Sequence, residues 1–274
     1  MRILRKAHPG VLLGALSKRR RHRFAPVLLL LVALGGTGVL YTAVVSTSGA
    51  QAANGASGVT LEEGRKLFLK NCATCHGINA QGSSDGPSLI GVGAAAVDFQ
   101  VETGRMPAAR LDAQIQRKPN TFSDKEIAAM AAYVASLGPG PSIPTKDQLD
   151  YSDADIAKGG SIYRTNCSMC HNYAGAGGAL SRGKYAPSLS NVTAENIYEA
   201  MITGPQSMPV FNDTSLTEED KKAVIGYLKA IGDQPAPGGA ELGRLGPVTE
   251  GAVGWVVGIG ALIGFAVWLG AKAR

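Results

Sequence analysis

Two short cysteine motifs constrain this chain more than any other feature of its sequence. They are Cys72-Ala73-Thr74-Cys75-His76 and Cys167-Ser168-Met169-Cys170-His171. Two cysteines separated by two residues and followed directly by histidine form the pattern for covalent attachment of haem c. Each thiol forms a thioether with one vinyl group of the porphyrin, and the adjoining imidazole becomes an axial ligand of the iron. We therefore expect two covalently bound haem c groups.

The four cysteines of the motifs, Cys72, Cys75, Cys167 and Cys170, are the only cysteines in the chain, so none remains for a disulfide. Zinc sites and thioredoxin-like redox pairs also use the Cys-x-x-Cys spacing. A histidine would directly follow both copies only very rarely by chance in such proteins. The pattern therefore favours haem attachment over both alternatives.

The count of histidines limits the other axial ligand of each iron. The chain has four histidines, of which His76 and His171 belong to the motifs. The other two, His8 and His22, lie before or within the basic run near the N-terminus. Because no histidine is left near the haems, we expect methionine as the sixth ligand if a protein side chain fills that position.

Two methionines suit this role. Met106 and Met208 lie in loops rich in glycine and proline, where helical periodicity does not dictate the direction of a side chain. Met130 and Met201 lie in helical patterns and are expected to be ordinary core residues. We therefore predict that His76 and Met106 bind one iron, and that His171 and Met208 bind the other.

The second half of the chain repeats the first at matched intervals. A glycine and an aromatic residue precede each motif by eight and four residues. A Pro-Ser-Leu sequence follows each motif, and its proline lies 17 residues before a glycine in both halves. The matched pairs are Gly64/Gly159, Phe68/Tyr163, Pro87/Pro187, Gly104/Gly204 and Tyr133/Tyr227. Equal intervals across loops of unequal length indicate one fold used twice.

Capping sequences predict two helices of the first repeat. Thr60 with Glu63 three residues later predicts a helix start that leads into the first motif. Ser123 with Glu126 predicts a second helix that continues to Leu137, where a glycine follows.

Each repeat resembles a class I cytochrome c domain. The resemblance implies an all-α fold in which the glycine and aromatic residue of the first helix pack against the last helix. It also implies that the backbone carbonyl groups of Pro87 and Pro187 accept a hydrogen bond from the haem-ligating histidines, which fixes the orientation and basicity of each ring.

The charges indicate membrane topology rather than nucleic-acid binding. The net charge is +6, yet residues 1–59 carry eight basic and no acidic side chains, and residues 60–240 carry 16 basic and 19 acidic ones. The uncharged run at 25–45 is long enough to span a bilayer, with the preceding arginines in the cytoplasm. It could equally be a secretory signal cleaved near Ala50-Gln51-Ala52. Either alternative exports everything after residue 50.

A second uncharged run, 251–271, is followed by Lys272 and Arg274. These charges favour a transmembrane helix with a cytoplasmic C-terminus, so the haem domains should lie on the extracytoplasmic side of the cell membrane. Its two Gly-x-x-x-Gly patterns favour packing against a partner helix. The predicted organisation is a leader and signal or anchor segment (1–50), cytochrome c domain 1 (60–138), a Pro/Gly linker (139–150), cytochrome c domain 2 (151–232), a tether (233–248) and a transmembrane helix (249–271).

Methionine is a soft ligand that favours ferrous iron, and a six-coordinate iron has no vacancy for a substrate. Electron transfer is therefore the expected role, without an independent substrate-turnover site in the chain. Over nearly its full length the chain resembles the dihaem cytochrome c subunit of the actinobacterial quinol–cytochrome c reductase, the bcc-type complex. That resemblance implies a cytochrome b subunit and a Rieske iron–sulfur protein as partners, with electrons passing to a haem-copper cytochrome c oxidase.

Two other functions share most of these features. A membrane-anchored dihaem cytochrome serving another dehydrogenase or oxidase would have the same haem motifs. A dihaem peroxidase would need one iron with an open or displaceable position, and the two predicted methionine ligands argue against it. The sequence leaves open which domain faces which partner.

Overall fold

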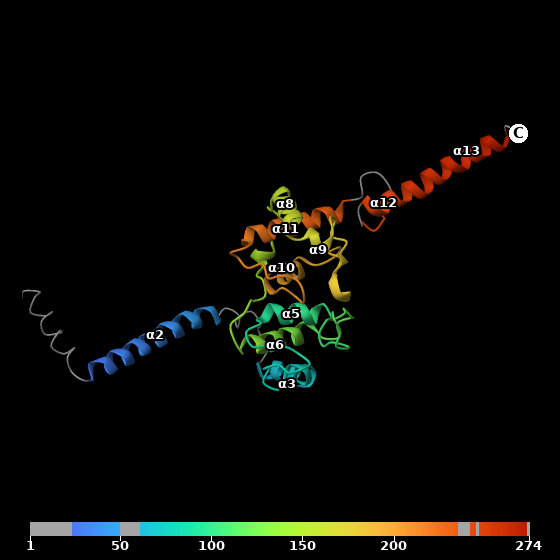
Figure 1. The fold of residues 1–274 in the computed structure, drawn as a ribbon. Coiled ribbons are helices and arrows are strands. Elements are labelled where there is room, and N and C mark those ends of the chain that lie inside the picture. Colours follow the sequence, from blue (N-terminus) through green and yellow to red (C-terminus); the bar gives the residue numbers. More distant parts are fainter. Residues whose placement is uncertain (1–23, 50–60, 235–241, 245–246, 273–274) are drawn as a thin grey trace, which may run out of the picture. The chain divides into compact units, whose positions relative to one another are not determined.

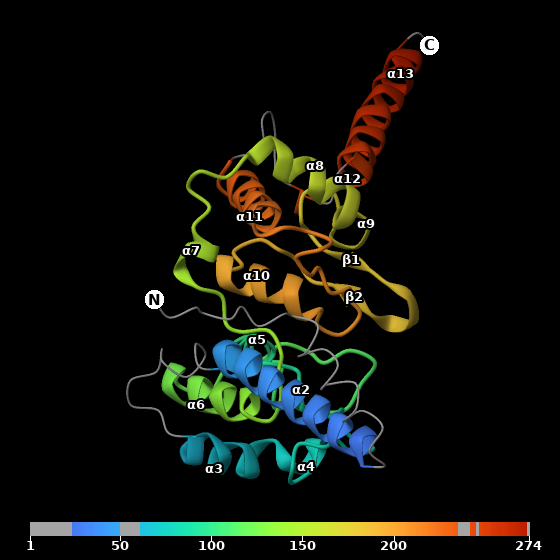
Figure 2. The same cartoon turned by 90° about the vertical axis from the view of Figure 1, so that its left-hand side faces the viewer.

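The computed structural model describes residues 24–49, 61–234, 242–244 and 247–272. The chain divides into a unit of residues 1–55 and a compact unit of residues 56–274, which contains both haem-binding motifs. Helix α2, Ala25–Gly49, belongs to the first unit. In the described part of the second unit, nearly all regular secondary structure is helical (Figures 1 and 2).

The first domain consists of four helices. They are α3 (Leu61–Asn71), α4 (Ala73–His76), α5 (Ala94–Glu102) and α6 (Asp124–Ala135). Helix α6 packs against both α3 and α5. Its buried face includes Met130, which is 2% exposed and therefore a core residue, as predicted.

The second domain repeats this arrangement after the short helix α7 (Lys146–Leu149). Its elements are α8 (Ile156–Asn166), α9 (Ser168–His171), β1 (Gly178–Ala179), the 3-10 turn η1 (Ser181–Gly183), β2 (Tyr185–Ala186), α10 (Ala194–Thr203) and α11 (Glu218–Asp233). Helices α8 and α11 form the main helix pair, and Met201 on α10 lies in the core at 2% exposure.

The predicted contact between glycine, aromatic residue and last helix is confirmed in both domains. A Cβ atom at Gly64 would lie 2.0 Å from the carbonyl oxygen of Ala129 on α6. The ring centroids of Phe68 and Tyr133 lie 5.3 Å apart, and those of Tyr163 and Tyr227 lie 5.5 Å apart. The absence of a glycine side chain therefore allows the two helices of each pair to approach closely, with an aromatic pair beside the contact.

Helix α6 begins at the predicted cap but ends two residues earlier than predicted. The backbone N–H and the hydroxyl group of Ser123 both donate to the Glu126 carboxylate at 2.9 Å, so α6 begins where predicted. It ends at Ala135 rather than Leu137, because the chain turns at Ser136. The predicted cap at Thr60 lies outside the described residues.

The two-residue strands were not expected from the sequence. Gly178 pairs with Ala186, and Ala179 pairs with Tyr185, in an antiparallel ladder. The connecting turn has positive φ angles at Arg182 (59°) and Gly183 (74°). Arginine rarely adopts a positive φ angle, so the sequence does not predict this turn. The domain is otherwise all-α, as predicted.

The two haem domains contact each other through α5 and α10, which face each other in Figure 2. The amide of Asn196 donates to the Glu102 carboxylate at 3.2 Å. The Gln114 side chain donates to the carbonyl oxygen of Tyr185 at 2.8 Å and accepts from its N–H at 2.6 Å. These bonds join residues that lie 71 and 94 positions apart in the chain.

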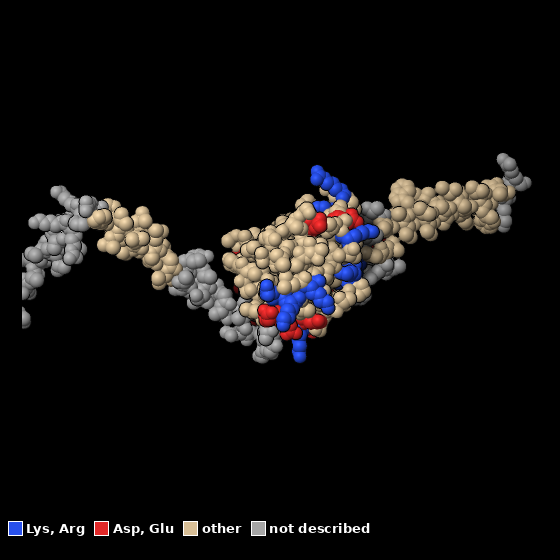
Figure 3. All heavy atoms as spheres, turned by 90° about the horizontal axis from the view of Figure 1, so that it is seen from below, with Lys and Arg blue, Asp and Glu red and all other residues tan. Residues whose placement is uncertain are grey.

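Among the described residues, one helix is long and apolar enough to cross a membrane, Thr249–Ala271, with a mean hydropathy of 2.1. It comprises α12 (Pro247–Val253), the π-helical turn η2 (Gly254–Ile259) and α13 (Gly260–Lys272). No charged side chain interrupts the face of α13 that Figure 3 shows. Helix α2 has 25 residues, Ala25–Gly49, and its side chains are described for Ala25–Val39. The cleavage sequence at 50–52 lies outside the described residues.

Candidate haem centres

Each Cys-x-x-Cys-His motif forms a single helical turn that continues directly from the first helix of its domain. The N–H of Cys72 donates to the carbonyl oxygen of Phe68 at 2.8 Å, and the N–H of His76 donates to that of Cys72 at 3.0 Å. The second motif has the same two bonds at Cys167 and His171, both 2.9 Å long. The first helix therefore fixes the position of the cysteines relative to the core.

Both motif histidines are oriented by the proline carbonyl groups named above. The Nδ1 atom of His76 lies 2.7 Å from the carbonyl oxygen of Pro87, and that of His171 lies 3.0 Å from the carbonyl oxygen of Pro187. A carbonyl oxygen can only accept, so Nδ1 carries the proton in each ring and Nε2 keeps its lone pair. An imidazole held in this tautomer is ready to bind a metal through Nε2.

The electrostatic environment agrees with ligand roles for these groups. Burial lowers the pKa of His171, against a smaller opposite effect of the bond to Pro187, so the neutral ring is favoured. Burial, followed by the neighbouring Cys75, raises the pKa of Cys72 to about 11, and burial followed by Cys170 does the same for Cys167. Thioredoxin-like pairs need a lowered thiol pKa, so this environment does not suit a thiol-exchange site.

A cavity in the second domain joins the predicted haem-binding residues. Cys167, Cys170 and His171 lie along its wall, and Met208 lines it from the loop after α10. The rest of the wall is largely apolar and includes Leu189, Ile197, Met201, Val224 and Leu228. The structure thus brings together both cysteines, the histidine and the methionine that the sequence singled out in this domain.

In the first domain, the predicted residues are connected through the core. Cys72 and Met106 both pack against a buried cluster of Val101, Ile127 and Met130. His76 is itself buried, at 7% exposure. Gly86 is required beside it, because a Cβ atom there would lie 2.9 Å from the carbonyl oxygen of Cys75.

Two arginines of the first domain line the cavity of the second, which sequence reasoning missed. Arg105 and Arg117 both lie in its wall. Arg105 is 8% exposed, its guanidinium lies 4.8 Å from the ring centroid of Phe99, and its Nη1 atom has no hydrogen-bond partner. Burial, followed by the charge of Arg117, lowers the pKa of Arg105 to about 10.

A haem fits this cavity chemically. Its porphyrin would meet the apolar wall, and its carboxylate groups could satisfy the unpaired Nη1 atom of Arg105. One weak indication of this arrangement is present in the sequence, where Arg105 directly precedes Met106. The domain contact that turns this arginine toward the other cavity could not be foreseen.

Comparisons with known proteins agree with this architecture. The family described as cytochrome c matches residues 61–138, and the family described as cytochrome c oxidase, cbb3-type, subunit III matches residues 154–228. The two matched segments correspond to the two haem domains. The chain therefore carries two covalently bound haem c groups.

Similar proteins extend the likeness to nearly the whole chain. The cytochrome bc1 complex cytochrome c subunit of Corynebacterium diphtheriae is 44% identical, over 93% of this chain and 96% of that protein. The subunit of the same name from Mycobacterium tuberculosis is 44% identical, over 95% of both chains. The cbb3-type cytochrome c oxidase subunit FixP of Bradyrhizobium diazoefficiens is 29% identical over 47% of this chain. The chain thus belongs to the family of cytochrome bc1 complex cytochrome c subunits and is a dihaem electron-transfer subunit of a quinol–cytochrome c reductase.

Proposed function

We propose that the ten residues named from the sequence hold the two haems in the following way. Cys72 and Cys75 bind one haem through thioethers, and Cys167 and Cys170 bind the other. His76 with Met106, and His171 with Met208, are the axial ligands of the two irons, and Pro87 and Pro187 orient the histidines. The observation that carries this proposal is the cavity in which Cys167, Cys170, His171 and Met208 meet.

The bound haems supply one-electron oxidation and reduction of iron. The Nδ1 bonds of 2.7 and 3.0 Å to the proline carbonyl oxygens hold His76 and His171 in one orientation, in which each would present Nε2 to its iron. Its apolar walls exclude water, which limits solvent reorganisation around the iron. With a histidine and a methionine on each iron, the chain itself would have no open iron position for substrate turnover.

The contact between the domains supports transfer from one haem to the other. Arg105 and Arg117 belong to the first domain yet line the cavity of the second. Arg105 directly precedes the predicted ligand Met106. The residue next to Met106 therefore lines the predicted haem site of the other domain, and this closeness supports direct electron transfer between the two haems.

For partners, we propose a cytochrome b subunit and a Rieske iron–sulfur subunit, with the Rieske protein donating electrons to one haem. The second haem passes them to a haem-copper cytochrome c oxidase. The likeness to proteins named as bc1 complex subunits supports a place in a complex with other subunits. The anchor at Thr249–Ala271 is followed by basic residues, which favours haem domains on the extracytoplasmic side and a cytoplasmic C-terminus.

Purification of the tagged full-length chain from native membranes in a mild detergent tests this assignment. We expect b-type haem and a Rieske protein to copurify, and a-type haem in the same peak if the oxidase is attached. A preparation that contains c-type haem alone would instead favour an anchored carrier. Carbon monoxide binding to one ferrous haem of the untreated protein would favour a peroxidase.

A further inference from the structure

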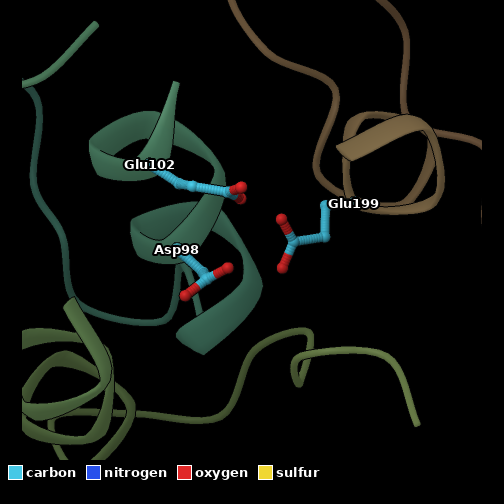
Figure 4. A group of neighbouring side chains, drawn as sticks. All are labelled: Asp98, Glu102 and Glu199. Carbon is cyan, nitrogen blue, oxygen red and sulfur yellow. The ribbon is translucent and has the colours of Figure 1, made fainter. Parts of the chain in front are cut away.

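Three carboxylates meet where the two haem domains touch. Asp98 and Glu102 project from α5, and Glu199 projects toward them from α10 (Figure 4). One oxygen atom from each of the three groups can be chosen so that all lie within 4.8 Å of one another. Asp98 and Glu199 lie 101 positions apart in the chain, so only the contact between the domains creates the cluster.

Among the three carboxylates, that of Glu199 is buried without a partner. Its side chain is fully buried at 0% exposure, and neither carboxylate oxygen has a hydrogen-bond partner. An ionised buried carboxylate reduces the stability of the fold by roughly several kcal/mol unless it is paired, neutralised or bound to a metal. Figure 4 shows its carboxylate group pointing toward those of Asp98 and Glu102.

The surroundings add negative charge instead of removing it. Burial, followed by Asp98, Glu195 and Glu102, raises the pKa of Glu199 to about 10. Burial, followed by Glu195, Glu102 and Asp124, raises the pKa of Asp98 to about 7. In the described part of the chain, no arginine, lysine or histidine forms a salt bridge with any of the three carboxylates. Among the described residues, the three carboxylates therefore lie together without a positive charge to balance them, and a bound cation would supply one.

The donor set suits a hard divalent cation. Calcium binds six to eight oxygen atoms at about 2.3–2.6 Å, among them carboxylates, carbonyl groups and waters. Magnesium usually keeps several waters and takes only one or two carboxylates. Mutual separations within 4.8 Å let one cation contact all three oxygens, and a set of three carboxylates around a buried side chain favours calcium.

An amide side chain of α10 contacts the cluster. Asn196, one helical turn before Glu199, has a buried Oδ1 atom without a hydrogen-bond partner. Its Nδ2 atom donates to the Glu102 carboxylate at 3.2 Å, which ties this amide to the cluster. Because calcium takes six to eight oxygen ligands, water molecules would complete the set that the three carboxylates begin.

We propose that Asp98, Glu102 and Glu199 bind a divalent cation, Ca²⁺, that joins α5 to α10 and so holds the two haem domains together. The cation replaces repulsion between the acidic groups with shared coordination. It therefore fixes the relative placement of the domains on which transfer between the haems depends. This site is separate from haem attachment and from the choice of redox partner.

The test uses the full-length haem-loaded protein in detergent. After treatment with a chelator, Ca²⁺ is titrated back while thermal unfolding and bound calcium are measured. We expect about one calcium per chain and a rise in melting temperature that saturates with Ca²⁺. The Glu199→Gln variant should bind Ca²⁺ at least roughly tenfold more weakly, as expected when a metal-site residue is lost.

A matched control is Glu62→Gln, which removes an exposed carboxylate from α3 and should leave the calcium response unchanged. If Ca²⁺ neither binds nor raises the melting temperature of the wild-type protein, the proposal is wrong, and a shared proton neutralises Glu199 instead. Equal calcium affinity in the wild type and in Glu199→Gln would also overturn it. None of these readouts depends on electron transfer, so they can fail while the proposed function holds.

Discussion

Replacement of Gly159 by alanine tests the packing on which the second haem domain depends. Gly159 lies on α8 at its contact with α11, and a Cβ atom there would be 1.9 Å from the carbonyl oxygen of Ala223 and 2.4 Å from its carbonyl carbon. Both neighbours are backbone atoms, so no side-chain rotation can relieve the clash. The helices must move apart by about 1 Å before the contact becomes tolerable.

The expected cost follows from this displacement. Overpacking of a core contact costs about 1–3 kcal/mol, occasionally more. Because this clash involves backbone atoms, we expect a cost at the upper end of that range, about 3 kcal/mol. Alanine recovers up to about 1 kcal/mol through its higher helix propensity, so the net loss should be about 2 kcal/mol. For a domain of this size, each kcal/mol shifts the melting temperature by roughly 4–8 °C.

The assay is thermal and denaturant unfolding of the haem-loaded protein, followed by circular dichroism. The matched control is Gly232→Ala on the partner helix α11, where an added Cβ atom would meet nothing within 4 Å. That variant should be as stable as the wild type or more stable, by up to about 1 kcal/mol. If Gly159→Ala melts at the wild-type temperature, the close approach of α8 and α11 is refuted.

Three further outcomes follow from the haem sites and the helix caps. Met208→Ala should let ferrous protein bind carbon monoxide at one haem, whereas Met201→Ala, which removes a buried core residue, should destabilise the protein without opening an iron. Arg105→Gln should lower the midpoint potential of one haem by on the order of tens of millivolts, because a nearby positive charge is lost. Arg105→Lys retains that charge and should largely keep the wild-type potential. Wild-type midpoint potentials in both variants would contradict a role of Arg105 at the cavity. The backbone N–H and then the hydroxyl group of Ser123 lower the pKa of Glu126 from 4.5. This carboxylate therefore stabilises the fold above pH 4.5 and loses that contribution as the pH falls below it. The loss of unfolding free energy caused by Glu126→Gln should be smaller in acid than at neutral pH. Equal losses at both pH values would contradict a lowered pKa of Glu126.

Local features of the fold could be predicted because short stretches of sequence determine them. The spacing of Gly159 and Tyr163 before Cys167 indicated the contact with Tyr227 on the last helix, and the aromatic rings lie 5.5 Å apart. The hydrogen bonds from His76 and His171 to the proline carbonyl groups fit the same repeat.

Features that depend on the contact between the domains could not be predicted. Arg105 lines a cavity of the other domain, and Glu199 meets Asp98 and Glu102 only because α5 faces α10. In the sequence these residues look like ordinary surface charges on separate helices. The turn at Arg182 escaped prediction for a different reason, since a positive φ angle at arginine has no compositional signal.

Reduction of the c-type haems by quinol tests the central claim most directly. The chain is purified with its bound subunits in mild detergent, a reduced quinol is added without oxygen, and the absorbance of the c-type and b-type haems is followed. We expect both c-type haems to become reduced, with electrons reaching them from the complex. If the b-type haem is reduced while the c-type haems stay oxidised, this chain does not carry electrons for a quinol–cytochrome c reductase.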